Sequence, residues 1–226
     1  MIGEFKKDGF VIVDSVFSKE ETAKLREITE SFFSVSGNGF GNCDGVTQPG
    51  FIDFAHFSEM KNMIFSNPKI LSTLKVVLGD EYRFCKHSDI AMNRQVGWHK
   101  DGLNGKYKIF EKTDPWKNNS DYRIVKTLIY LQDHADPSWQ HALEVKKGSH
   151  LVNNLNDGES VFLRPALGSV IVFDQRLTHQ ARYKKINPNN RILITLGFGA
   201  NNYYTDEFEQ GTKARQDEQN MYRRQI

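Results

Sequence analysis

The stretch Ile124-Val125-Lys126-Thr127-Leu128-Ile129-Tyr130-Leu131 is rich in β-branched residues and lies between polar segments, which is typical of a β-strand. Comparable short runs occur before and after it, at residues 82–95, 142–145, 160–163, 169–173 and 191–198. Turn-forming sequences such as Asp136-Pro137 and Asn156-Asp157-Gly158 separate them. Strands here do not alternate with helical segments. The pattern therefore predicts a double-sheet jelly roll over residues 81–200.

The first 80 residues have a different, largely helical pattern. Ser18 with Glu21 forms the sequence of a helix capping box, and amphipathic helices are expected after Ser18, at residues 58–64 and at residues 68–78. Residues 37–50 are rich in glycine and asparagine and predict a long loop. Residues 201–226 predict a charged tail that is either a surface helix or frayed. We expect one domain over residues 1–226, with a helical support at 1–80.

The composition narrows the class of protein. The chain has 226 residues, with 30 Lys and Arg against 28 Asp and Glu, so a nucleic-acid partner is not expected. Two cysteines are too few for a disulfide framework, and the sequence has neither a signal peptide nor an apolar run long enough to span a bilayer. We expect a cytoplasmic protein, monomeric or homodimeric, that acts on a small molecule and does not bind a membrane.

Three short pairs of the form His-x-Asp are candidate metal ligands. A histidine and an aspartate two positions apart on a strand face the same side, and with a second histidine they form the facial triad of non-haem iron enzymes. The pairs are His87 with Asp89, His99 with Asp101, and His134 with Asp136. We favour His99 and Asp101, because Gly97 and Gly102 flank them where a strand opens into a loop, and because His134 and Asp136 suit a turn.

Six segments in order resemble the phytanoyl-CoA dioxygenase family, over about residues 5–200. These segments are Gly97-Trp98-His99-Lys100-Asp101, Val125 to Leu131, Gly148-Ser149-His150, Gly168 to Asp174, Arg176-Leu177-Thr178-His179 and Arg191. The family consists of Fe(II)- and 2-oxoglutarate-dependent oxygenases on a double-stranded β-helix, a cupin-like jelly roll. The resemblance thus implies a mainly β fold with N-terminal helices and the cofactors Fe(II), 2-oxoglutarate and O2.

The resemblance also implies roles for individual residues. His99, Asp101 and His179 would bind iron. Arg191, which follows His179 by twelve residues, would bind the far carboxylate of 2-oxoglutarate, since a guanidinium donates two parallel hydrogen bonds to a carboxylate. Thr127 would add a hydroxyl to the same cosubstrate. The implied reaction is hydroxylation of a small molecule with release of succinate and CO2.

Two departures and several alternatives qualify this hypothesis. Related halogenating enzymes have Gly or Ala at the carboxylate position, so Asp101 disfavours halogenation, and Ala181 replaces a hydroxyl residue that some relatives have. The alternative outcomes are desaturation, cyclisation or epimerisation. A further alternative is an inactive cupin-like binding protein. Residues 37–50 and 102–121 are the candidate lids.

Overall fold

A computed structural model describes residues 1–35, 38–42, 45–101, 114–117, 121–182 and 187–223. Within these residues, ten strands form two sheets in which all pairs are antiparallel. The strands are β1 (Phe10–Val13), β2 (Phe40–Asn42), β3 (Gly45–Pro49), β4 (Tyr82–Met92), β5 (Ile124–Tyr130), β6 (Leu143–Lys146), β7 (Ser160–Leu163), β8 (Val170–Asp174), β9 (His179–Gln180) and β10 (Ile192–Ala200).

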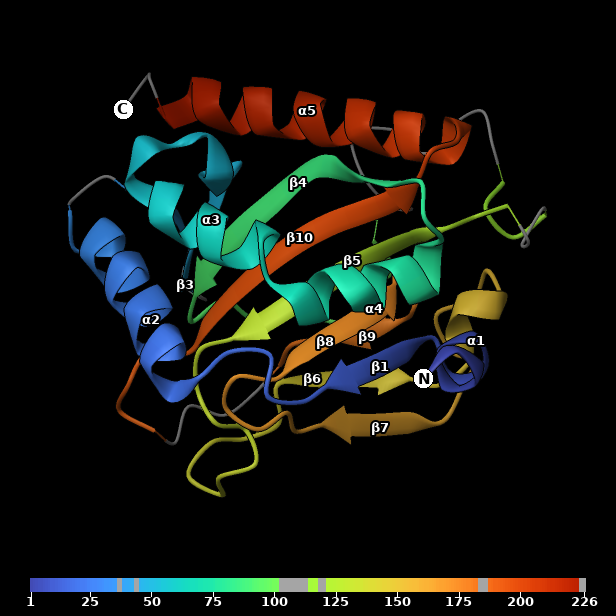
Figure 1. Ribbon diagram of the computed structural model, residues 1–226, viewed down its shortest axis with the longest axis horizontal. Coiled ribbons are helices and arrows are strands. Elements are labelled where there is room, and N and C mark those ends of the chain that lie inside the picture. The colour runs from blue at the N-terminus through green and yellow to red at the C-terminus, as the bar shows by residue number, and fades with distance from the viewer. Residues whose placement is uncertain (36–37, 43–44, 102–113, 118–120, 183–186, 224–226) are drawn as a thin grey trace.

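The larger sheet has the strand order β1-β8-β5-β10-β4-β3-β2, and the smaller has the order β7-β6-β9 (Figure 1). Leu128, Tyr130, Leu143, Val145 and Phe173 belong to a buried cluster contributed by both sheets. The sheets therefore face one another across an apolar layer, as in a jelly roll. This arrangement confirms the mainly β, jelly-roll fold predicted from the pattern of short strands.

Helices cover the outer face of the larger sheet, in front of it in Figure 1. Ser18 caps the helix that begins at Lys19. Its Oγ accepts a hydrogen bond from Glu21 N, and Glu21 accepts one from Ser18 N, so the predicted capping box is present. A second apolar core, which includes Leu25, Met60 and Leu74, lies between these helices and the sheet. The N-terminal helices are α1 (Ile2–Asp8), α2 (Lys19–Ser34), α3 (Ser58–Phe65) and α4 (Pro68–Leu78).

The segment expected as a long loop at residues 37–50 forms strands instead, because β2 and β3 extend the larger sheet beyond β4. Thr47 and Gln48 pair with Ala91 and Ile90, so backbone hydrogen bonding to an existing edge overrides the weak strand propensity of glycine and asparagine. The first 80 residues thus contribute three strands as well as helices to the fold.

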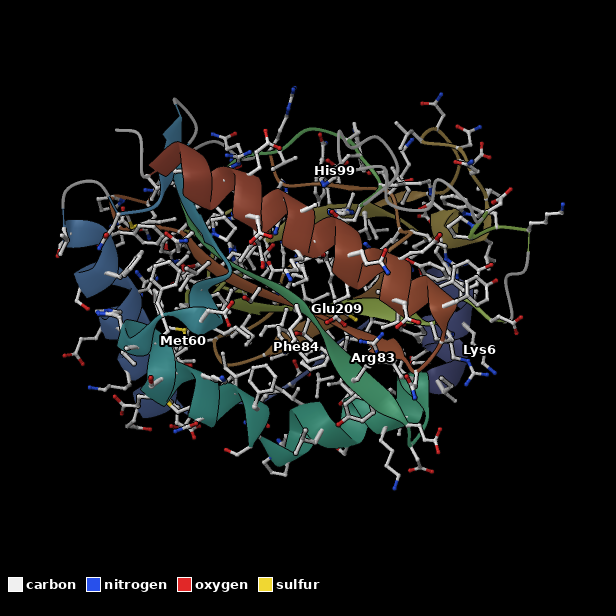
Figure 2. All side chains as sticks on the ribbon, turned by 90° about the horizontal axis from the view of Figure 1, so that it is seen from above. Lys6, Met60, Arg83, Phe84, His99 and Glu209 are labelled. Carbon is white, nitrogen blue, oxygen red and sulfur yellow. The ribbon has the colours of Figure 1, made fainter. Side chains whose placement is uncertain are left out.

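The C-terminal tail is helical from Tyr203 to Arg223 and forms α5. It is no isolated surface helix, because Tyr204, Thr205, Phe208 and Thr212 are buried. Figure 2 shows α5 lying over β4, with Met60 and Phe84 on the helix-covered side of the sheet and His99 on the opposite side. Within the described residues, no helix is long and apolar enough to cross a membrane.

Candidate metal centre

His99, Asp101 and His179 meet between the two sheets. His99 and Asp101 follow β4, and His179 begins β9. The Nε2 of His99 lies 3.6 Å from Asp101 Oδ1, and the Nε2 of His179 lies 3.6 Å from Asp101 Oδ2. One ligand atom from each residue falls within 4.8 Å of the others. The structure therefore brings together the three residues selected from the sequence.

Backbone hydrogen bonds fix both imidazoles. His99 and His179 form an antiparallel bridge, each donating its N–H to the other's carbonyl at 3.0 Å. The Nδ1 of His99 lies 2.7 Å from Gly97 O, and the Nδ1 of His179 lies 2.9 Å from Leu177 O. A carbonyl can only accept, so in the neutral imidazole Nδ1 carries the proton and Nε2 has the lone pair. Both Nε2 atoms are thus ready to coordinate a metal.

The electrostatics suit a centre that keeps its carboxylate ionised. Burial alone would raise the pKa of Asp101, but the charge of Lys126 and the hydrogen bond with His99 help to outweigh it, and this pKa is held well below its usual range. Burial, followed by the neighbouring His99, lowers the pKa of His179 to about 3, so its imidazole is neutral. For His99, burial is outweighed by the hydrogen bond and charge of Asp101, and its pKa is raised. A metal cation bound here would replace the proton that Asp101 favours on the imidazole of His99.

Lys126 is a site residue that the sequence analysis missed. Its Nζ lies 2.8 Å from Asp101 Oδ2, and the residue is only 8% exposed. Its neighbours Val125 and Thr127 face the helices, so the two-residue period of β5 turns Lys126 inward together with Leu128. A charged residue inside an otherwise apolar strand was the available signal.

The structure does not bring Thr127 to the centre. This residue is fully buried, pairs with Val172 and Leu196 in the helix-side core, and places its hydroxyl 3.4 Å from Leu196 O. Adjacent residues of a strand point to opposite faces, so Thr127 cannot share the interior with Lys126. The side chain of Thr127 therefore lies on the helix side of β5, away from the candidate metal ligands.

Arg191 does lie in the interior. It immediately precedes β10 and is 3% exposed. Its guanidinium is centred 5.0 Å from the ring of Tyr130 and donates a hydrogen bond to Ala142 O, so it sits between β5 and β6. A buried guanidinium in the same inter-sheet space as the candidate ligands can receive a carboxylate.

The other two His-x-Asp pairs have structural partners. Asp89 forms a bidentate ion pair with Arg215 of α5, at 2.6 and 2.9 Å, beside the buried His87. Asp136 accepts a hydrogen bond from Ser138 N at 2.7 Å and caps a turn, as expected. Asp89 thus binds a helix and Asp136 a turn, and neither joins the candidate metal ligands.

Two further residues of the central segment have defined contacts. Lys100, between the two ligands, is buried and its Nζ donates to Arg176 O at 2.8 Å and to Ser149 O at 2.5 Å. Trp98 lies under the Nζ of Lys146, 5.3 Å from the ring centre. Most of the candidate lid at residues 102–121 lies outside the described residues; its residue Pro115 accepts a hydrogen bond from Arg176.

The sequence matches no known family model and no curated protein. Solved structures with the same fold include HygX from Streptomyces hygroscopicus with nickel, 2-oxoglutarate and hygromycin B bound, at 16% identity over 87% of this chain and 85% of that one, with a TM-score of 0.64. They also include the α-ketoglutarate-dependent epimerase SnoN from nogalamycin biosynthesis, at 14% identity over 88% and 81%, with a TM-score of 0.65.

A third is EctD from S. alaskensis with 2-oxoglutarate and 5-hydroxyectoine, at 17% identity over 88% of this chain and 74% of that one, with a TM-score of 0.67. At such identities the likeness establishes a shared architecture. The likeness agrees with the jelly-roll topology of the strands.

Proposed function

We propose that this protein is an Fe(II)- and 2-oxoglutarate-dependent oxygenase that acts on a small molecule. The observation that carries the proposal is the convergence of two Nε2 atoms and one carboxylate within 4.8 Å, with both imidazoles fixed through Nδ1. Two histidines and one carboxylate on a face are the donor set of such iron centres. Three structural neighbours whose names include 2-oxoglutarate or α-ketoglutarate support it.

His99, Asp101 and His179 would hold the iron, and the bound centre would supply the oxidising power that removes hydrogen from a substrate carbon. The residues of the chain do the rest. Arg191 would orient the cosubstrate by pairing with its far carboxylate, and the 3% exposure of Arg191 means that this pairing occurs away from water. The surrounding sheets limit the access of water to the reacting groups.

Hydroxylation is the outcome we favour, with succinate and CO2 as the products of the cosubstrate. Epimerisation or ring formation on the same centre is the second candidate, because the neighbours include the epimerase SnoN and the carbocyclase SnoK. Product analysis separates these outcomes, since hydroxylation adds one oxygen atom to the substrate, whereas epimerisation leaves its mass unchanged.

We further propose membership of the phytanoyl-CoA dioxygenase family, supported by the six ordered sequence segments. HygX and SnoN are named with hygromycin B and with nogalamycin biosynthesis, and a small organic molecule is likewise the partner that we propose here. A cytoplasmic location and a monomeric or homodimeric state complete the proposal and rest on the sequence.

The test is an anaerobic titration of the protein with Fe(II) and then 2-oxoglutarate. Wild-type protein should develop the weak visible charge-transfer band of an iron-bound 2-oxo acid, and should form succinate when O2 is admitted. His99→Ala and His179→Ala should lose the band and succinate formation, because each removes one of three protein ligands.

His56→Ala is the matched control. His56 packs in the helical layer, with its Nε2 2.9 Å from Ile28 O, so its removal should preserve the charge-transfer band. The proposal fails if wild-type protein binds neither Fe(II) nor 2-oxoglutarate, or if His99→Ala forms succinate at the wild-type rate.

A further inference from the structure

Lys126 lies where a strand normally holds an apolar residue. Its side chain projects between the sheets beside Leu128, and the residue is 8% exposed. Transfer of an ammonium from water to such a place is costly unless a carboxylate compensates it, and Asp101 does so across 2.8 Å. Such a buried pair is weak evidence for stability, so its position beside the candidate ligands points to function.

The two oxygens of Asp101 have different surroundings. Oδ1 lies 3.6 Å from the Nε2 of His99. Oδ2 lies 3.6 Å from the Nε2 of His179, but it is also the atom that Lys126 holds at 2.8 Å. The ammonium of Lys126 therefore forms its ion pair with Oδ2, which accepts no other hydrogen bond within the described residues, and a cation placed among the three residues would compete with it for that oxygen.

We propose that Lys126 is a positioning residue that holds Asp101 Oδ2 and so restricts Asp101 to one oxygen on the metal. This inference rests on the proposed function, because it concerns the same centre.

The restriction matters because coordination positions are few. An octahedral ion has six, of which three go to the protein if Asp101 is monodentate. A 2-oxo acid that chelates takes two more, and one remains for dioxygen. If Asp101 bound through both oxygens, it would occupy that last position. By keeping Asp101 monodentate, Lys126 therefore leaves one coordination position open for dioxygen.

Exchangeable water on Mn(II) reports the number of open positions directly. In Mn(II)-loaded protein, bound water enhances the relaxation rate of solvent protons in proportion to the number of water ligands. For wild-type protein we expect three such waters, and for Lys126→Met two, so the enhancement should fall by about one third. After saturation with 2-oxoglutarate, the remaining enhancement should persist in wild-type protein and vanish in Lys126→Met.

Two variants separate positioning from general damage. Lys126→Arg retains a cation that can hold a carboxylate and should preserve the enhancement. Val125→Ala, one position earlier on β5, removes apolar contacts on the helix side and should lower stability while preserving the enhancement. Lys126→Gln is the second neutral variant and should behave like Lys126→Met.

Equal enhancement in wild-type protein and in Lys126→Met, both saturated with Mn(II), overturns the inference. It is likewise overturned if neither neutral variant folds with Mn(II) present, because the lysine then serves the fold. Failure of the wild-type protein to bind Mn(II) or 2-oxoglutarate is a different result, which contradicts the proposed function itself.

Discussion

Arg191 shows how one buried side chain can separate cosubstrate binding from metal binding. It lies beside Tyr130 and Ala142 and contributes no atom to the group of His99, Asp101 and His179. A change there should affect the far end of a bound dicarboxylate and leave the metal ligands as they are.

Arg191→Lys should weaken 2-oxoglutarate binding by about tenfold or more, because an ammonium cannot make the parallel pair of hydrogen bonds that a guanidinium makes. The affinity for Fe(II) alone should stay at the wild-type value. Both are measured by anaerobic titration, with Arg164→Lys as the control, because Arg164 is exposed and immediately follows β7. An unchanged affinity for 2-oxoglutarate would show that another residue binds the far carboxylate.

Helix α5 is joined to the larger sheet by charge as much as by apolar contact. Arg83 of β4 forms ion pairs with Asp206 and Glu209, and Arg215 forms the bidentate pair with Asp89. These ion pairs supplement the buried side chains of Tyr204 and Phe208, which explains how a segment with few apolar residues packs on the domain.

The pair formed by Asp89 predicts a pH dependence. Burial would raise the pKa of Asp89, but Arg215 and His87 outweigh it and lower this pKa from 3.8 to about 2. Because the folded-state pKa is the lower one, the stabilisation is fully present above pH 3.8 and is lost as the pH falls through about 2. The shift corresponds to roughly 2 kcal/mol.

Urea unfolding of wild-type protein and of Asp89→Asn should therefore show a difference in the free energy of unfolding that shrinks as the pH is lowered from 6 toward 2. Asp217→Asn, at an exposed position of α5, serves as the control for removing a carboxylate. A difference for Asp89→Asn that stays constant over this pH range would contradict the assigned cause.

The start of α5 also depends on a close approach to β10. A Cβ on Gly199 would overlap the hydroxyl of Thr205, lie 2.9 Å from its Cγ2 and lie 3.2 Å from Cys85 Sγ. Gly199→Ala should lower the free energy of unfolding by about 1–3 kcal/mol, because the overpacked site must shift. In the background of Thr205→Ala the same substitution should cost less. Equal costs in both backgrounds, measured by urea unfolding, would rule out this contact as the cause.

At the scale of the whole molecule, apolar periodicity predicts the elements whose cores are apolar. The strands around Ile124 to Tyr130 and the helices after Ser18 and Pro68 were predictable for this reason. Residues 45–49 form a strand because β4 offers them an unpaired edge, which local sequence cannot indicate. Likewise, α5 is stabilised by partners distant in sequence, among them Asp89.

The candidate site follows the same division. The spacing of His99 and Asp101 was visible in the sequence, whereas the choice among three such pairs needed the partner His179 to be placed beside one of them. Lys126 and Thr127 differ in the face of β5 that each occupies. A shift of one residue in the register of this strand would turn Thr127 toward the candidate ligands and Lys126 toward the helices, so the sequence alone does not distinguish them.

The fold should persist without metal, because apolar packing and backbone hydrogen bonds support it. The two larger buried clusters consist of apolar side chains, the His99–His179 bridge is made by backbone groups, and Lys126 compensates the charge of Asp101. Chelator-treated protein should therefore keep its circular dichroism and a cooperative thermal transition. Fe(II) with 2-oxoglutarate, under anaerobic conditions, should then raise Tm, since ligands that bind only the folded state stabilise it by about 2.7 kcal/mol at one hundred times Kd.

His99→Ala should show the cooperative transition without this rise. If chelation instead unfolds the wild-type protein, the metal is part of the folding core, and the preorganised centre described here would have to be abandoned.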